Sequence, residues 1–362
     1  MKQLILLLVI LWSGFTLSAQ EGFKITGNLG GTLGGKLILV GTGQQGNVGL
    51  GETLMENGSF RFEGKVDGMM PAYILTEQQQ LVVTLMLENT DYAIVAGESG
   101  IEVRGGGEAQ AVLSQYDAVN RVVLREKMKM EQEMQAAYAS QNQMKLQALQ
   151  QQFAKVMEET GKQQAALFAA HKDSPVTAFV IASSMGQMDY ASLRPLYDGL
   201  GETAKNSPFG QAIARQLEVF KQVEVGAVAP DFQGTTIEGE TVSLHGINAK
   251  LKLVDFWASW CKPCREEMPD VAKLYKKYHD KGLEIVGVSL DEKKEEWVKA
   301  SRDDKITWVN LSDLLGGRSP IAALYVVRAI PQTFLLDGEN RIIAKGLHKK
   351  DLEKKIAEIL GE

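Results

Sequence analysis

The sequence has few of the residues that build metal centres and disulfide frameworks. Its 362 residues include only 2 Cys and 4 His. Two cysteines exclude a disulfide framework and any all-cysteine metal site. The histidines are far apart in sequence, so a His-based metal cluster has no local support. We therefore expect no metal ion, and no organic cofactor is implied by the sequence.

Clustered positive charge and long apolar runs are also missing. The 39 Lys and Arg residues are scattered among 45 Asp and Glu, which gives a formal charge of -6. Nucleic-acid binding needs clustered basic side chains, so we expect no nucleic-acid partner. Beyond the N-terminal segment, no stretch approaches the roughly 20 apolar residues that cross a bilayer. At roughly 150 residues per domain, the length predicts two to three domains.

The first residues have the pattern of a signal peptide. Lys2 supplies a positive start, residues 4–12 are apolar, and Leu17-Ser18-Ala19 precedes Gln20. We expect residues 1–19 to be removed and the mature chain to lie in the periplasm. The alternative is an uncleaved membrane anchor. Either outcome exports the remainder into a compartment where thiols oxidise.

Residues 20–107 are predicted to form a small antiparallel β domain. Short β-type runs alternate with glycine, and Asn57-Gly58 is a hairpin signal because both central positions of that turn need positive φ.

Residues 108–222 are predicted to be helical. Ser174-Pro175 and Ser207-Pro208 have the pattern of a cap followed by a first helical proline. An apolar stripe rich in Met either packs as a helix–helix core, the commoner case, or forms an adaptable partner surface. The stripe consists of Leu113, Tyr116, Val123, Met130, Met134, Tyr138, Leu146, Leu149, Phe153 and Met157.

Residues 223–362 are predicted to form an α/β sandwich. Buried-strand runs at 251–256 and 283–290 alternate with helical patterns at 268–279 and 295–301. Asp337-Gly338 then predicts a hairpin, and residues 350–360 a closing helix.

Two thiols, Cys261 and Cys264, lie where the first of these strands meets its helix. Unpaired N–H groups and the helix dipole stabilise a thiolate at Cys261, while Cys264 lies a turn further in. Such a pair can attack a disulfide, form a mixed disulfide and resolve it. A zinc site would need ligands that the chain lacks, and a structural disulfide across so short a loop would add little stability.

Three motifs carry a resemblance to a known family. Residues 254–269, VDFWASWCKPCREEMP, resemble the active-site stretch of the thioredoxin superfamily, and in particular the exported ResA/TlpA-like thiol-disulfide oxidoreductases. Residues 228–232, VAPDF, and 329–334, AIPQTF, are similar to that family's opening motif and proline loop. The resemblance implies a thioredoxin-like C-terminal domain. The β region resembles a domain of unknown function that precedes such domains in exported Bacteroidetes proteins.

The resemblance also implies residue roles. Cys261 would attack the substrate disulfide, and Cys264 would resolve the mixed disulfide that forms. Pro331 would be a cis proline facing the disulfide, where the backbone of Ile330 pairs with an extended substrate; a trans turn proline is the alternative. Trp260, Lys262 and Pro263 would border the substrate, although Trp257 and Trp260 are equally compatible with plain core packing.

Two carboxylates are candidates for moving the proton of the resolving thiol. Asp255 lies within an apolar strand, where burial should raise its pKa. Glu267 matches the acidic residue that ResA-like proteins hold near their thiols, and such a carboxyl can deprotonate Cys264. Structural roles remain open for both. Gly287 stands roughly where cytosolic thioredoxins place a lysine opposite the buried aspartate, so pairing of Asp255 is uncertain.

The expected function is thiol-disulfide exchange with protein substrates. Pro263, where oxidising relatives usually carry His, favours a reductant or isomerase that draws on an upstream electron donor. The alternatives are a peroxiredoxin-like peroxidase and a binding or assembly protein, in which the β or helical region holds a partner or a second protomer. A peroxidatic Cys normally follows a Thr three residues earlier, where this chain has Ala258.

Overall fold

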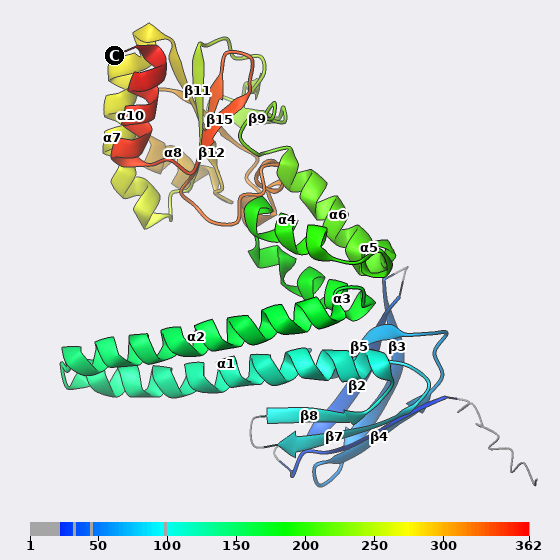
Figure 1. Cartoon of the computed structure of the whole chain (residues 1–362). Helices are drawn as coiled ribbons and strands as arrows, with labels where there is room; N and C mark the ends of the chain where they lie inside the picture. Colours follow the sequence, from blue (N-terminus) through cyan, green and yellow to red (C-terminus); the bar gives the residue numbers. More distant parts are fainter. Residues whose placement is uncertain (1–21, 32–33, 44–45, 98–99, 362) are drawn as a thin grey trace, which may run out of the picture. The chain divides into compact units, whose positions relative to one another are not determined.

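The computed structural model in Figure 1 describes residues 22–31, 34–43, 46–97 and 100–361. The predicted signal peptide lies outside them. The chain divides into two compact units, one with residues up to Ser183 plus Gly199–Gly210, the other with Ser184–Asp198 plus the residues from Gln211 onward. Within the described residues, no helix combines the length and apolar character that a bilayer crossing requires.

The first unit starts with two four-stranded sheets, in the orders β4-β1-β7-β8 and β3-β2-β5-β6. Their strands are β1 (Phe23–Asn28), β2 (Gly35–Gly43), β3 (Gly46–Met55), β4 (Ser59–Gly64), β5 (Met70–Thr76), β6 (Leu81–Leu87), β7 (Asp91–Gly97) and β8 (Gly100–Gly105). The pairs are antiparallel as predicted, except that β1 and β7 run parallel. Alternate residues of β1, such as Phe23 and Ile25, are buried.

The predicted turn at Asn57-Gly58 is confirmed, with φ of 49° and 77°. It connects β3 to β4 and therefore carries the chain from one sheet to the other. A Cβ atom at Gly58 would lie 2.1 Å from the backbone nitrogen of Gly31, so both the positive φ and the close approach require glycine.

Six helices follow: α1 (Glu108–Ala139), α2 (Gln143–His171), α3 (Pro175–Ser184), α4 (Tyr190–Gly199), α5 (Glu202–Asn206) and α6 (Pro208–Lys221). Pro175 and Pro208 are first helical residues, as predicted. The long helices α1 and α2 lie side by side as a hairpin (Figure 1), and Asn142 caps α2 by accepting from the amide of Lys145 at 3.0 Å.

The apolar stripe is only partly a helix–helix core. Leu113 and Tyr116 are buried in one cluster with Val176 and Phe179 of α3. Further along the hairpin, Tyr138 is 61% exposed and Met157 is 47% exposed. Two paired helices share a single seam, so residues that face away from it meet solvent. The prediction of a core was therefore wrong for that part of the stripe.

The second unit contains a seven-stranded mixed sheet in the order β10-β9-β13-β12-β11-β14-β15. Its strands are β9 (Gln233–Thr236), β10 (Thr241–Ser243), β11 (Leu251–Trp257), β12 (Leu283–Ser289), β13 (Val309–Ser312), β14 (Gln332–Asp337) and β15 (Ile342–Lys345). Its remaining helices are α7 (Lys262–Tyr278), α8 (Lys294–Asp303), α9 (Pro320–Leu324) and α10 (Lys349–Leu360). The predicted α/β architecture is confirmed.

Strand β11 positions the site. All of its residues are buried, and it lies between β12, to which it runs parallel, and β14, to which it runs antiparallel. Asp255 is paired with Thr333 of β14, and both line a cavity beside α7 and α10. Phe256 instead packs against Tyr325 and Phe334. Alternation along the strand thus places the carboxyl group of Asp255 on the side that faces α7.

The second predicted hairpin forms with a different turn. β14 and β15 pair antiparallel around Asp337-Gly338. The turn closes with a hydrogen bond from the amide of Asp337 to the carbonyl oxygen of Arg341, at 2.9 Å. Asn340, just before Arg341, has a left-handed backbone with φ of 63°. The predicted hairpin is confirmed, and Asp337 and Gly338 lie within its turn, which is longer than two residues.

Candidate active site

The two cysteines lie at the N-terminus of α7. They form a disulfide with an S–S distance of 2.05 Å. Cys261 is the N-cap of the helix, since its Sγ accepts a hydrogen bond from the amide of Cys264 at 3.2 Å. The sulfur of Cys261 therefore lies where backbone N–H groups and the helix dipole stabilise negative charge.

The proline loop lies against this disulfide. The Ile330–Pro331 peptide bond is cis, as predicted. Sγ of Cys261 lies 3.7 Å from the carbonyl oxygen of Ile330. The loop residue expected to meet a substrate is thus adjacent to the sulfur expected to attack.

The remaining residues predicted to contact substrate are exposed beside the disulfide. Trp260 is 64% exposed. Lys262 extends into solvent and pairs loosely with Glu266 at 3.8 Å, and Pro263 is exposed. Trp257 differs, because it is fully buried and its Nε1 donates to Asn310 at 3.1 Å. Core packing therefore describes Trp257 but not Trp260.

A buried carboxylate that sequence reasoning missed holds the loop before Cys261. Asp291 is 1% exposed. It accepts hydrogen bonds from the amide of Ser259 at 3.0 Å, from the hydroxyl of Ser259 at 2.5 Å and from the hydroxyl of Ser289 at 2.7 Å. Arg265 of α7 also contacts this loop, because it donates a hydrogen bond to the carbonyl oxygen of Ser259 at 3.4 Å. The same side chain forms a salt bridge with Asp304.

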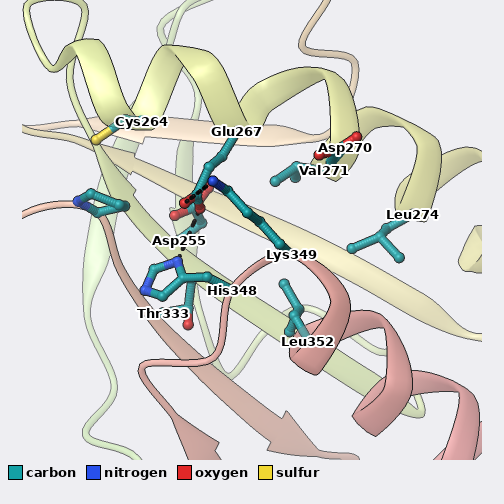
Figure 2. A pocket seen from close by; sticks show the side chains of 11 residues that line it. Asp255, Cys264, Glu267, Asp270, Val271, Leu274, Thr333, His348, Lys349 and Leu352 are labelled. Atoms are coloured by element: carbon teal, nitrogen blue, oxygen red, sulfur yellow. Dashed lines mark hydrogen bonds and ion pairs between the residues drawn. The ribbon is translucent and has the colours of Figure 1, made fainter.

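Behind the disulfide is a small cavity between α7, the sheet and the start of α10 (Figure 2). Its volume of about 20 Å³ accommodates one water molecule. Cys264, Asp255 and Glu267 all line it, so the structure brings both predicted carboxylates to Cys264.

Asp255 is the buried carboxylate of this cavity. Burial, together with the charge of Glu267, raises the pKa of Asp255 to about 7. Gly287 lies opposite Asp255 in the sheet, and a Cβ atom there would meet Asn310, Trp257 and Trp308. A lysine at this position would not fit, and Asp255 forms no salt bridge with any residue that the structure describes.

Glu267 has two basic neighbours that sequence reasoning did not identify. Its Oε2 lies 3.0 Å from Nδ1 of His348, and its Oε1 lies 4.0 Å from Nζ of Lys349. Figure 2 shows both basic side chains reaching the carboxylate from the start of α10. Because 81 residues separate His348 from Glu267, no local spacing signals the pair.

The chain is similar in sequence to known families and proteins. The chain matches the AhpC/TSA family over residues 225–345 and a domain of unknown function, DUF4369, over residues 23–112. It is 39% identical to the thioredoxin-like protein YneN of Bacillus subtilis over 142 residues, which are 37% of this chain and 79% of YneN. It is 34% identical to the thiol-disulfide oxidoreductase ResA of Geobacillus kaustophilus over 140 residues, which are 38% of this chain and 79% of ResA.

Among solved structures, the thioredoxin domain of a thiol-disulfide oxidoreductase from Bacteroides vulgatus is 35% identical, with a TM-score of 0.36. The match covers 38% of this chain and 98% of that domain. The family assignment follows from the sequence identity to YneN and ResA over 79% of each. The chain therefore belongs to the thioredoxin-like thiol-disulfide oxidoreductases.

Proposed function

We propose that the chain is an exported oxidoreductase that exchanges its Cys261–Cys264 dithiol with disulfides of protein substrates in the periplasm. The observation that carries this proposal is the redox pair at the start of α7, with Cys261 facing the cis-proline loop. The similarity to thiol-disulfide oxidoreductases such as ResA supports the reaction class, and the apolar N-terminal pattern supports the compartment.

In the reducing direction, the thiolate of Cys261 attacks a substrate disulfide and displaces one substrate thiolate. Cys264 then loses its proton and attacks the sulfur of Cys261. The enzyme disulfide forms, and the second substrate thiolate leaves and takes a proton from water. Ile330 and Pro331 would pair with the extended substrate, while Trp260, Lys262 and Pro263 would contact it from the exposed side.

Asp255 and Glu267 would accept the proton of Cys264. Both line the cavity that contains this cysteine, and a pKa of about 7 for Asp255 lets the carboxyl exchange protons near neutral pH.

We also propose that the enzyme works as a reductant or isomerase and receives its electrons from an upstream donor. The basis is Lys262-Pro263 between the cysteines, in place of the His that oxidising relatives carry. Residues 20–107 and 108–222, preceding the catalytic domain at 223–362, would select the partner or hold a second protomer.

The proposal is tested with the full mature chain in two assays. In the first, the protein with dithiothreitol should accelerate insulin precipitation, while a Cys261→Ser, Cys264→Ser double variant should not. In the second, Cys264→Ser should trap substrates as mixed disulfides on Cys261 in the native compartment, and the double variant should trap none. A protein without either activity would favour the assembly alternative, and peroxide consumption without insulin reduction would favour the peroxidase.

A further inference from the structure

The cavity behind the disulfide has one side open to solvent, and His348 lies on that side. Asp255 is 4% exposed and Cys264 is 1% exposed. The side chain of Glu267 is 18% exposed and that of His348 is 30% exposed. The exposed fraction therefore increases in the order Cys264, Asp255, Glu267, His348.

We infer that His348 is a positioning residue that acts through Glu267, and that it carries the proton of the resolving thiol between Glu267 and solvent. The inference rests on the proposed function, because it assigns a route to the proton that the exchange reaction must move.

The contact with Glu267 is direct and is the main support for this route. Nδ1 of His348 and Oε2 of Glu267 are 3.0 Å apart, a hydrogen-bond distance (Figure 2). Histidine is the side chain suited to this task, since its two ring nitrogens can accept a proton at one end and release one at the other near neutral pH. Lys349, at 4.0 Å, adds positive charge but has no acceptor for a proton.

His348 and Lys349 stand at the start of α10, where the backbone departs from the helix. His348 is the N-cap of α10, yet its side chain makes no capping hydrogen bond. Lys349 follows with φ of 49°, in the left-handed region that non-glycine residues rarely adopt. Helix capping therefore does not explain the position of the His348 side chain, whereas its contact with Glu267 does.

The proton balance closes over a full cycle. When Cys264 attacks the mixed disulfide, its proton passes through the carboxylates to Nδ1 of His348, and Nε2 releases a proton to water. When the upstream donor reduces the disulfide, Nε2 takes a proton from water and Nδ1 returns one through Glu267 to Cys264. Each half of the cycle restores the tautomer that the other half requires.

Charged groups border this route from three elements, and Lys277 of α7 and Glu353 of α10 are among them. Asp255 faces it from β11 and Asp270 from α7, and Asp270 pairs with Lys273 at 2.8 Å. Lys349, Lys350 and Asp351 border His348 from α10. His348 is the one imidazole among the described residues that line the cavity, so replacing it leaves these charges in place.

The test uses reduced full-length protein and 5,5′-dithiobis(2-nitrobenzoate). Attack of Cys261 on the reagent releases one equivalent of its coloured thiolate and leaves a mixed disulfide on Cys261. Attack of Cys264 on that mixed disulfide releases the second equivalent. We expect His348→Gln, which keeps a hydrogen-bonding side chain, to slow the second phase about tenfold at pH 7 and to leave the first unchanged. His348→Ala should be slowed similarly and restored by added imidazole. His279→Gln, a change at an exposed histidine elsewhere in the domain, is the matched control.

An unchanged second phase in His348→Gln would overturn the inference. A slow second phase that imidazole does not restore in His348→Ala would also overturn it, because His348 would then act only on structure. Wild-type protein that fails to release the second equivalent would instead contradict the proposed function, so the two failures are distinguishable.

Discussion

Asp255 and Glu267 line the same cavity, and the negative charge of Glu267 adds to the burial that raises the pKa of Asp255 to about 7. The two carboxyl groups come from β11 and α7, and Cys264 lines the same cavity. A carboxyl group with a pKa near neutral thus lies close to the thiol for which we propose a proton transfer.

Asp255 should make the oxidised protein less stable as the pH rises. The folded state keeps the proton of Asp255 up to about pH 7, whereas the unfolded chain loses it near the ordinary value of 3.8. The free energy of unfolding should therefore fall between these pH values, by up to about 4 kcal/mol. Asp255→Asn should remove this fall and be the more stable protein at pH 8.

Urea unfolding followed by tryptophan fluorescence checks this at pH 5 and pH 8. Trp257, Trp260, Trp297 and Trp308 all lie in the catalytic domain, and the fifth tryptophan, Trp12, is in the predicted signal peptide. The signal therefore reports this domain within the full chain. Equal pH dependence in the two proteins would contradict the prediction.

Glu267→Gln should slow the resolution of mixed disulfides. The substitution removes a proton acceptor and also the charge that contributes to the raised pKa of Asp255. We expect a reduction of about tenfold or more at pH 7 in the phase that reports Cys264. Glu266→Gln changes the neighbouring exposed carboxylate and is the control. A normal rate in Glu267→Gln would remove this residue from the mechanism.

Asp291→Asn should loosen the loop before Cys261. The carboxylate accepts hydrogen bonds from Ser259 and Ser289 while almost fully buried. Hydrogen bonds to a charged group contribute about 1.5–3 kcal/mol each, so we expect a loss of about 2 kcal/mol or more in the free energy of unfolding. Glu292→Gln, at the next and exposed position, should cost almost nothing. Similar stabilities for the two variants would show that Asp291 does not hold the loop.

The reduction potential tests the proposed direction. A reductant or isomerase should have a potential well below about -120 mV, the oxidising end of the superfamily range. Pro263→His should raise the potential, since an imidazole near the helix N-terminus stabilises the thiolate of Cys261. Equilibration with glutathione buffers measures both proteins. A wild-type value near the oxidising end would reverse the assignment.

Sequence reasoning succeeded where the signal was local. Cys261 and Cys264 follow a buried apolar run and precede a helical pattern, so the strand–helix junction and the position of both thiols on it could be predicted together. The turn at Asn57-Gly58 was readable for the same reason, because the two residues needed for positive φ are adjacent.

It failed where the determining contacts span long distances in the chain. His348 reaches Glu267 across 81 residues, and Asp291 reaches Ser259 across 32. No spacing rule connects such residues, because the sheet order brings them together. The parallel pairing of β1 with β7 and the exposed end of the α1–α2 hairpin have the same origin, since both depend on which element packs against which.

The sulfur of Cys261 caps α7 and is also the proposed attacking atom, and this double role affects the choice of an inactive variant. Alanine at this position would delete the acceptor for the amide of Cys264 and fray the first turn, so lost turnover could reflect a damaged scaffold. Serine preserves an acceptor of similar reach. Inactive versions of this enzyme are thus best built with serine.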